Sequence, residues 1–291
     1  MATETTHALA TRFVALDVHR QYLMVGAVDV QQHVVLAPRR FSFEAFDEWA
    51  PAHLTHADAV VLEATANAWL LYDHLQPLVA EVIVAHPRAV KLIAAARVKT
   101  DSRDTIKLAS LLAANLIPAV WVPPQEVREL RALVAHRRRL VQQRTQAGNR
   151  LHGVLHRHNL APPPGKPFAA HQREWWLALD LPPSEELRVQ QDMRLHQTLE
   201  ELISGVEAEL GRLSTRDPWV QQVPFLVQLP GLGVLSAMRV LAAIGEITRF
   251  PSAKHLVSYA GLAASVHQSG ETNRGGHITK EGRSDQRARS G

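Results

Sequence analysis

The chain has 291 residues, 46% of them hydrophobic, which is enough for two or three domains with apolar cores. The absence of cysteine excludes disulfides, thiolate zinc sites and a cysteine nucleophile, and it favours a reducing, cytoplasmic location. The net charge is only +4, but Arg and His gather in residues 128–158 and again after Arg274. These stretches predict surfaces for phosphate backbones, although an Arg-rich helix is often only a solvated face. We expect no signal peptide, no membrane span and no membrane partner.

The first part of the chain alternates short apolar runs with amphipathic segments. Its pattern predicts strands and helices in an order that an RNase H-like mixed sheet requires, although a generic α/β domain also has it. The Pro-rich stretch near residue 118 predicts the end of this domain, 1–118. The expected strands are 13–19, 22–30, 33–36, 59–63 and 81–85, and the expected helices are 43–54, 69–79, 89–96 and 104–115.

Residues 119–216 form a predicted helical arm with coiled-coil periodicity. From Glu126 a heptad pattern begins with Val127 and Leu130, but Arg137, Arg144 and Gly148 interrupt it. A Pro-rich linker, 161–167, cannot continue a helix, and a second helix is expected over 185–213. The two helices could pair as an antiparallel hairpin or across protomers. The apolar seam of the second helix is expected at Leu195, Leu199, Leu202, Val206 and Leu213. The adjacent Trp175 and Trp176 are expected either to anchor a small core or to stack on bases.

Residues 217–291 form the third predicted domain, which is mainly α-helical. LPGLG, residues 229–233, precedes an apolar helix over 234–244 and resembles half of a helix-hairpin-helix. The backbone N–H groups at Gly231 and Gly233 could then bind a phosphate, whereas the alternative is a tight turn between core helices. The polar tail, 267–291, is expected to be loop or disorder unless a ligand orders it.

Acidic residues end two of the expected apolar strands and begin a helix. Asp17 follows VAL and Glu63 follows VVL, and a carboxylate at the end of a buried strand needs a compensating cation or hydrogen bonds. Asp101 and Asp104 are three residues apart, on one face of a helix. Hard oxygen donors of this kind select Mg²⁺, with Mn²⁺ as the alternative, and two such ions about 4 Å apart suit phosphodiester cleavage.

Each acidic residue also has a simpler interpretation. Asp101 could be only a helix N-cap, and Asp104 could only complement the helix dipole. Glu63 could pair with an arginine, and Asp17 could be the phosphate-site aspartate of a sugar-kinase-like domain. No Gly-rich phosphate loop follows Asp17, because the next residues are Val18, His19 and Arg20.

Several motifs together resemble one known family. They are FVALDVH, VVLEATANAW, VIVAHPRAVKLIAAARVKTDSRDTIKLA, LPGLGVLSA and the tail HQSGETNRGGHITKEG. Spanning nearly the whole chain, they resemble the insertion-sequence "one-ten" family of transposases, which have a DEDD catalytic domain, and the related Piv-type DNA invertases.

The resemblance implies a Mg²⁺-dependent DNA recombinase with an N-terminal RuvC-like domain and a C-terminal serine domain. It implies Asp17, Glu63, Asp101 and Asp104 as metal ligands, and Ser269 as a nucleophile that forms a phosphoserine with DNA. It also implies a structured guide RNA (bridge RNA), a homo-oligomer (dimer or tetramer) and a bacterial, nucleoid-associated protein. The residues expected to contact nucleic acid are Lys99, Arg103, Arg137, Arg138, Arg139, Arg144, Arg150, Gly231, Gly233, Arg274, Lys280 and Arg283.

The C-terminus departs from the family's pattern. Relatives continue past the KxG segment with a Leu-Arg pair and an Ala-rich helical tail, whereas this chain ends RSDQRARSG, as a truncation would. Three hypotheses therefore stay open. They are an active RNA-guided serine recombinase, a non-catalytic nucleic-acid-binding remnant, and a RuvC-like nuclease that uses water in place of Ser269.

Overall fold

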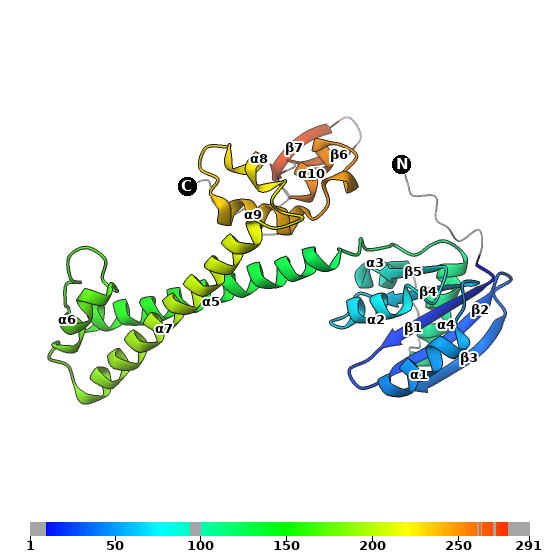
Figure 1. The fold of residues 1–291 in the computed structure, drawn as a ribbon, viewed down its shortest axis with the longest axis horizontal. Helices are drawn as coiled ribbons and strands as arrows, with labels where there is room; N and C mark the ends of the chain where they lie inside the picture. Colours follow the sequence, from blue (N-terminus) through cyan, green and yellow to red (C-terminus); the bar gives the residue numbers. More distant parts are fainter. Residues whose placement is uncertain (1–9, 94–99, 261, 263, 270–271, 279–291) are drawn as a thin grey trace. The chain divides into compact units, whose positions relative to one another are not determined.

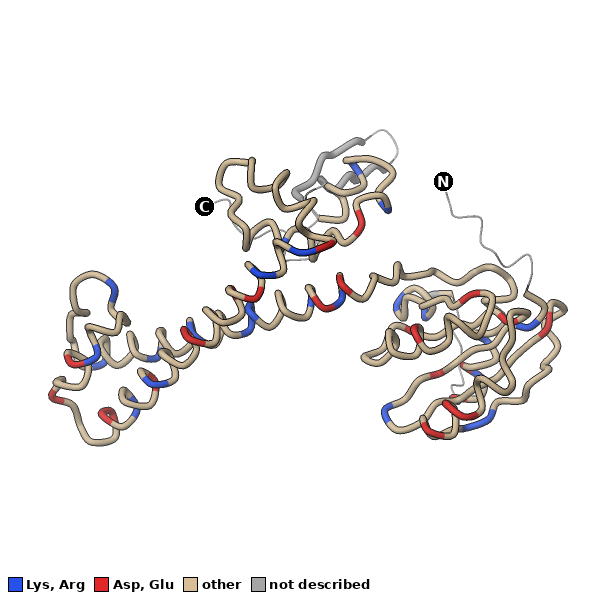
Figure 2. The backbone as a smooth tube through the Cα atoms, in the orientation of Figure 1, with Lys and Arg blue, Asp and Glu red and all other residues tan. Residues whose placement is uncertain are grey.

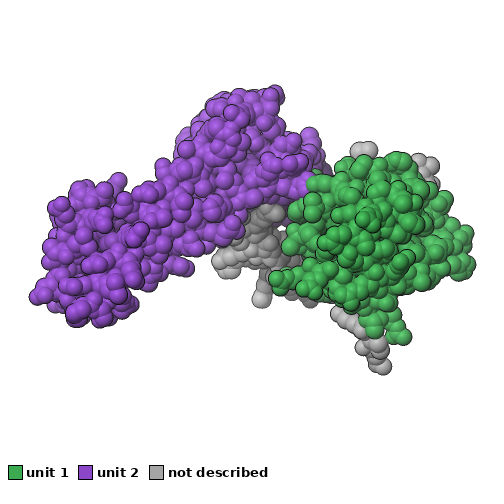
Figure 3. All heavy atoms as spheres, turned by 60° about the horizontal axis from the view of Figure 1, so that its bottom comes forward, with its two compact units in different colours: residues 1–122 green, residues 123–291 purple. Residues whose placement is uncertain are grey.

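A computed structural model shows two compact units, residues 1–122 and 123–291 (Figure 3). The structure describes residues 10–93, 100–260, 262, 264–269 and 272–278. The division falls at residue 122, close to the expected boundary at 118, and a further boundary near residue 216 stays a prediction. Within the described residues, no helix combines the length and the apolar character that crossing a membrane requires.

The N-terminal unit is built on a five-stranded mixed sheet in the order β3-β2-β1-β4-β5 (Figure 1). Adjacent strands β1, β2 and β3 form an antiparallel meander, and β4 and β5 add parallel to β1. The predicted strands are thereby confirmed, with β3 extending further than expected. Their bounds are β1 Arg12–Val18, β2 Leu23–Asp29, β3 Val34–Phe41, β4 Asp58–Glu63 and β5 Glu81–Ala85.

Side chains of the central strands alternate between two apolar cores. On β1, Val14, Leu16 and Val18 face the core that also contains residues of α1 and α2. Phe13 and Ala15 face the second core, which contains residues of α3 and α4. The unit therefore has three layers, with the sheet in the middle. The helices are α1 Phe43–His53, α2 Ala68–Leu75, α3 Pro87–Ile93 and α4 Asp101–Ala113.

A glycine lets α4 lie close to the sheet. Gly26, on β2, sits where the β2–β3 register shifts. A Cβ atom built there would lie 3.1 Å from Cδ1 of Ile106 and 3.2 Å from Cγ2 of Thr105, both on α4. Any side chain at position 26 would push this helix outward, because these contacts are already tight.

A buried ion pair ties the amino ends of β1 and β4 together. Asp58 is 1% exposed, and it accepts hydrogen bonds from Nε of Arg12 at 2.5 Å and from Nη2 at 2.7 Å. The backbone N–H of Thr55 donates to the same carboxylate at 2.7 Å. The hydrogen bond with Asp58 raises the pKa of Arg12, so the guanidinium stays charged beside this carboxylate.

The C-terminal unit contains two long helices, α5 (Gln125–Arg157) and α7 (Pro183–Ser214), which pack along each other (Figure 1). Arginines predominate along α5 after its first turns, whereas α7 carries residues of both signs (Figure 2). Ion pairs join the helices, and the residue number falls on α7 as it rises on α5, so the helices are antiparallel. The pairs are Arg137–Glu207, Arg144–Glu200, Arg150–Asp192 and Arg157–Glu185.

The arginines that interrupt the heptad pattern face carboxylates on α7. The Arg137 and Arg144 side chains are only 23% and 32% exposed, so each occupies a seam position with its charge paired. The expected α7 seam was wrong for Leu195 and Leu202, which are 42% and 50% exposed. A different stripe of α7 is buried, because it matches the spacing on α5; it consists of Val189, Met193, His196, Leu199, Ile203, Leu210 and Ser214.

The segment between the long helices packs back onto them through aromatic side chains. Trp176, on α6 (Arg173–Leu177), is 1% exposed and donates from Nε1 to the carbonyl oxygen of Pro167 at 2.7 Å. The interpretation of this tryptophan as a core anchor is therefore confirmed. Phe168 stacks on Trp176 and lies 3.1 Å from the position of a Cβ on Gly148, so this glycine makes room for the aromatic ring.

The remaining elements are η2, which lies directly before α6, and those that follow α7. The helix predicted over 234–244 is confirmed as α9, and α9 packs against α5, since Nε of Arg131 donates to the carbonyl oxygen of Ala242 at 2.7 Å. Loop or disorder was expected from residue 267 onward, and this was wrong for residues 267–269 and 272–278. These residues belong to an antiparallel strand pair, which the many glycines of this segment did not indicate. The elements are η2 Ala170–Gln172, α8 Val223–Val227, α9 Val234–Ile244, η3 Ile247–Arg249, α10 Ala253–Tyr259, β6 Ala264–Ser269 and β7 Thr272–Ile278.

Candidate active site

Two acidic residues end neighbouring parallel strands at one edge of the sheet. Leu16 of β1 pairs with Leu62 of β4, so Asp17 and Glu63 are the next residues on the two strands. Both continue the alternating series that faces the α3 and α4 layer, where Phe13 and Ala15 precede Asp17. The fold thus brings residues 46 positions apart to one edge and one face of the sheet.

Helix α4 begins at this same face with two aspartates in its first turn. Its N-cap is Thr100, whose side-chain oxygen accepts a hydrogen bond from the backbone N–H of Arg103. The interpretation of Asp101 as the N-cap was therefore wrong, and the Asp101 carboxylate is available for another role. The Thr105 hydroxyl donates to the carbonyl oxygen of Asp101 at 2.7 Å, which fixes the backbone of this turn.

Asp17, His19 and Asp101 form a compact cluster. One potential ligand atom of each lies within 4.8 Å of those of the other two. Nε2 of His19 lies 3.2 Å from Oδ2 of Asp17 and 3.5 Å from Oδ2 of Asp101. The side chains are 27%, 34% and 48% exposed, in the order Asp17, His19, Asp101, so the cluster is half-buried and open to solvent.

The electrostatics of this cluster favour an added cation. Burial raises the pKa of Asp17 above its ordinary value, and the negative charges of Asp101 and Asp104 raise it further. Only His19 acts in the opposite direction. A divalent cation would stabilise the ionised carboxylates, and oxygen donors with an imidazole nearby suit Mg²⁺ or Mn²⁺.

Tyr22, Arg40 and His19 surround Asp101, and the acidic pattern alone did not indicate them. The Tyr22 hydroxyl donates to Oδ2 of Asp101 at 2.9 Å, and the Tyr22 ring stacks on the His19 ring with centroids 4.5 Å apart. The guanidinium of Arg40 lies 3.8 Å from the centroid of the Tyr22 ring. A usable signal was the Asp17-x-His19 spacing, because residues two apart on a strand share a face.

The expected acidic residues are brought together in part. Asp17 and Asp101 belong to the cluster, and Asp104 is near enough to influence the pKa of Asp17. Glu63 ends the adjacent strand β4 on the same face of the sheet. It does not belong to the cluster that Asp17, His19 and Asp101 form within the described residues. Of Ser269 the structure describes only the backbone, which ends β6 and pairs with Thr272.

Comparison with known families identifies both units. A model of the DEDD domain of IS110 transposases, described as "Transposase", matches residues 14–160. A second model, described as "Transposase IS116/IS110/IS902 family", matches residues 224–289. The chain belongs to the IS110 family of DEDD transposases. The mixed five-stranded sheet of the N-terminal unit is consistent with the RNase H-like DEDD domain of such a transposase.

Curated relatives agree with this assignment to the transposase family. A protein of Pseudomonas aeruginosa named as a family 20 transposase is 28% identical over 280 residues, covering 92% of this chain and 79% of that protein. The protein y4qE of Sinorhizobium fredii, named as a transposase, is 29% identical, covering 76% of this chain and 54% of y4qE. The pilin gene-inverting protein of Moraxella bovis is 26% identical, covering 76% and 62%. The chain thus spans only about half the length of y4qE.

The arginines expected to contact nucleic acid in this transposase fall into two groups. Arg137, Arg144 and Arg150 have carboxylate partners on α7, so part of their charge already serves to join two helices. Arg103, Arg138 and Arg139 are exposed. Their contact with nucleic acid stays a prediction for both groups.

The glycines and tail residues of the expected interface are described unevenly. Gly231 has a φ of +83°, and Gly233 is the N-cap of α9, so both lie at the start of this helix, as expected. Arg274 belongs to β7, where only the backbone is described. Lys99, Lys280 and Arg283 lie outside the described residues.

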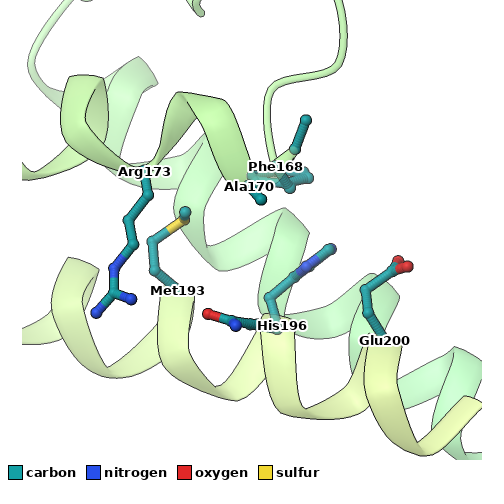
Figure 4. Close-up of a pocket in the computed structure, with 8 residues that line it drawn as sticks. Phe168, Ala170, Arg173, Met193, His196 and Glu200 are labelled. Carbon is teal, nitrogen blue, oxygen red and sulfur yellow. The ribbon is translucent and has the colours of Figure 1, made fainter.

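A separate cavity of about 400 Å³ lies between the Phe168 segment and α7 (Figure 4). Its wall includes His196, whose pKa burial lowers, and Glu200, which is paired with Arg144. Phe168 closes one side and already packs on Trp176 and His196.

Proposed function

We propose that this transposase cuts and rejoins DNA strands at a divalent-metal centre on the carboxyl edge of its sheet. The observation that carries the proposal is the crowding of the Asp17 and Asp101 carboxylates around His19, with one potential ligand atom of each residue within 4.8 Å of the others. Such an arrangement is costly for a structural site, but it suits a site that receives a cation. The pilin gene-inverting relative is named for inverting DNA, which is the same class of reaction.

The ligands would be Asp17, Glu63, Asp101 and Asp104. A bound Mg²⁺ pair, or Mn²⁺, would polarise a phosphodiester and lower the pKa of an attacking hydroxyl. The protein's own contribution is to fix the carboxylates on rigid elements. Two are strand ends of a buried sheet, and the other two are in the first turn of α4.

Ser269 is the proposed nucleophile. Its Oγ would attack phosphorus and form a phosphoserine ester, while the bond between phosphorus and the departing deoxyribose oxygen breaks. The serine proton passes to a base, and the departing oxygen gains a proton. A hydroxyl of the exchanged strand then attacks the same phosphorus and releases Ser269, so the phosphodiester is re-formed without hydrolysis. RNA guidance and a homo-oligomer, the remaining parts of the proposal, rest on the family resemblance.

A covalent-adduct assay tests this proposal. The purified chain is incubated with Mg²⁺, the noncoding RNA that flanks its element and labelled element-end DNA, and then run on a denaturing gel. We expect an adduct with the wild type and none with Ser269→Ala or Asp17→Ala. Matched controls are Ser265→Ala, on the same strand as Ser269, and Asp47→Ala, an exposed carboxylate on α1 that is 61% exposed.

Each alternative outcome identifies a different function. An adduct that survives Ser269→Ala would contradict the serine assignment. Nicked DNA without an adduct, dependent on Asp17, would indicate a nuclease that uses water. Binding of DNA or RNA without any cleavage would indicate a non-catalytic remnant, and it would overturn the proposed activity.

A further inference from the structure

The turn between β1 and β2 carries side chains that make direct contact with the candidate metal site. It runs from His19 to Tyr22, and the backbone N–H of His19 donates to the carbonyl oxygen of Tyr22 at 2.9 Å. Although Tyr22 is 79 residues from Asp101 in sequence, its hydroxyl donates to Oδ2 of that residue at 2.9 Å. This hydrogen bond joins the strand that carries Asp17 to the helix that carries Asp101.

The Tyr22 ring is held on both faces. His19 stacks on it with centroids 4.5 Å apart and an interplanar angle of 22°. The Arg40 guanidinium, from β3, lies 3.8 Å from the ring centroid. Since one ring face cannot hold both groups at these distances, the ring is sandwiched between them, and the cation–π contact stabilises this position. The hydroxyl is therefore presented to Asp101 by a ring that has little freedom to turn.

The geometry points to Tyr22 as a positioning residue for Asp101, one that orients this carboxylate toward the divalent ion of the proposed function. A carboxylate oxygen can accept a hydrogen bond and still donate a lone pair to a cation. An oriented ligand binds a metal more tightly than a freely rotating one, and losing such an outer hydrogen bond typically weakens binding about 10–100-fold. The inference rests on the proposed metal site but adds a residue that the acidic motif does not contain.

The test measures Mn²⁺ binding by electron paramagnetic resonance, with no DNA and no turnover. Tyr22→Phe keeps the ring between His19 and Arg40 and removes only the hydroxyl. We expect its Mn²⁺ dissociation constant to rise by about tenfold or more, with an unchanged metal-free melting temperature. The matched control is Tyr72→Phe, because Tyr72 is a half-buried tyrosine of the same unit that packs against the other core.

A double-mutant cycle separates positioning from a general effect. In an Asp101→Asn background, Tyr22→Phe should change Mn²⁺ affinity by less than twofold, since the two residues act as one unit. Equal affinities of Tyr22→Phe and wild type, with binding still lost in Asp17→Ala, would overturn the inference and leave the metal site standing. A wild type that binds no Mn²⁺, or binding that Asp17→Ala leaves intact, would overturn both.

Discussion

The carboxylates of the two units are balanced in opposite ways. On the α5/α7 pair, carboxylates of α7 face arginines of α5 in four successive ion pairs. At the carboxyl edge of the sheet, Asp17 and Asp101 face each other across a single histidine, and burial raises the pKa of Asp17. The first arrangement neutralises its own charge and holds two helices in register. The second brings two carboxylates together, an arrangement that suits the cation proposed for this site.

The same contrast occurs within a single strand pair. At the amino ends of β1 and β4, Arg12 and Asp58 neutralise each other in a buried ion pair. Near the carboxyl ends, β1 carries Asp17 as its penultimate residue and β4 ends in Glu63. An acidic residue in a strand therefore indicates function only when its position and partners are known, because one end of β4 is structural and the other is a candidate for chemistry.

Removing one partner of the buried pair should give the largest effect on stability. We expect Asp58→Ala to destabilise the N-terminal unit by about 3 kcal/mol, because it leaves the Arg12 charge without its partner. Hydrogen exchange of the β1 and β4 amides measures this unit separately from the other one. Asp47→Ala, on the surface of α1, removes a carboxylate that is 61% exposed and should change these rates little. Equal effects of the two variants would contradict the distinction between buried and exposed carboxylates.

Reversing the charge of Arg137 on α5 should destabilise the protein less than Asp58→Ala does, and a second charge reversal on α7 should restore the stability. Arg137→Glu places two carboxylates together on the α5/α7 seam, and we expect a loss of about 1–2 kcal/mol. The exchange Arg137→Glu with Glu207→Arg restores opposite charges and should recover most of this loss in urea denaturation. Failure to recover would mean that contacts of Arg137 other than its ion pair with Glu207 stabilise the α5/α7 seam.

The smallest expected effect is a gain in stability at the sheet edge. The folded-state pKa of Asp17 is raised by burial, so its ionisation disfavours the folded state at pH values above that pKa. Without divalent ions, Asp17→Asn should therefore melt slightly above wild type at neutral pH. The difference should fall as the pH passes down through the folded-state pKa and should vanish below the ordinary value of 3.8.

A divalent ion should reverse this order of stability. Added Mn²⁺ stabilises only the protein that binds it, so the wild type should rise in melting temperature while Asp17→Asn does not. If Asp17→Asn melted below wild type in chelator at neutral pH, the unbalanced-charge description of the sheet edge would be wrong.

Short apolar runs bounded by polar residues predicted the N-terminal sheet. Phe13, Ala15 and Asp17 share one face of β1, but residues 13–16 are all apolar because both faces of this strand are buried. The α7 seam was harder, because two stripes of this helix contain leucines. Leu195 and Leu202 have suitable spacing but stay exposed, and only the packing partner on α5 decides which stripe is buried. A local pattern does not contain that partner.

The candidate site was predictable where it depends on strand ends and helix starts. Asp17 could be expected there because a carboxylate at the end of a buried strand is unfavourable without a compensating partner. Asp101 was indicated by its spacing of three residues from Asp104 at the start of a helix. Tyr22 and Arg40 could not be expected, since neither residue type is unusual in a strand or a turn. Their roles depend on the contact between the β1–β2 turn and α4. In this contact Tyr22 meets Asp101, which is 79 residues away in the sequence.

Gly26 has no chemistry, yet it acts as the spacer that sets the geometry of the site. Because α4 lies directly over this glycine, the thickness of one residue determines how deeply the helix settles on the sheet. The helix carries Asp101 and Asp104 at its first turn, while the sheet carries Asp17 and Glu63. A side chain at position 26 would meet Thr105 and Ile106 on α4, so a glycine here allows the helix that carries Asp101 and Asp104 to pack closely on the sheet that carries Asp17 and Glu63.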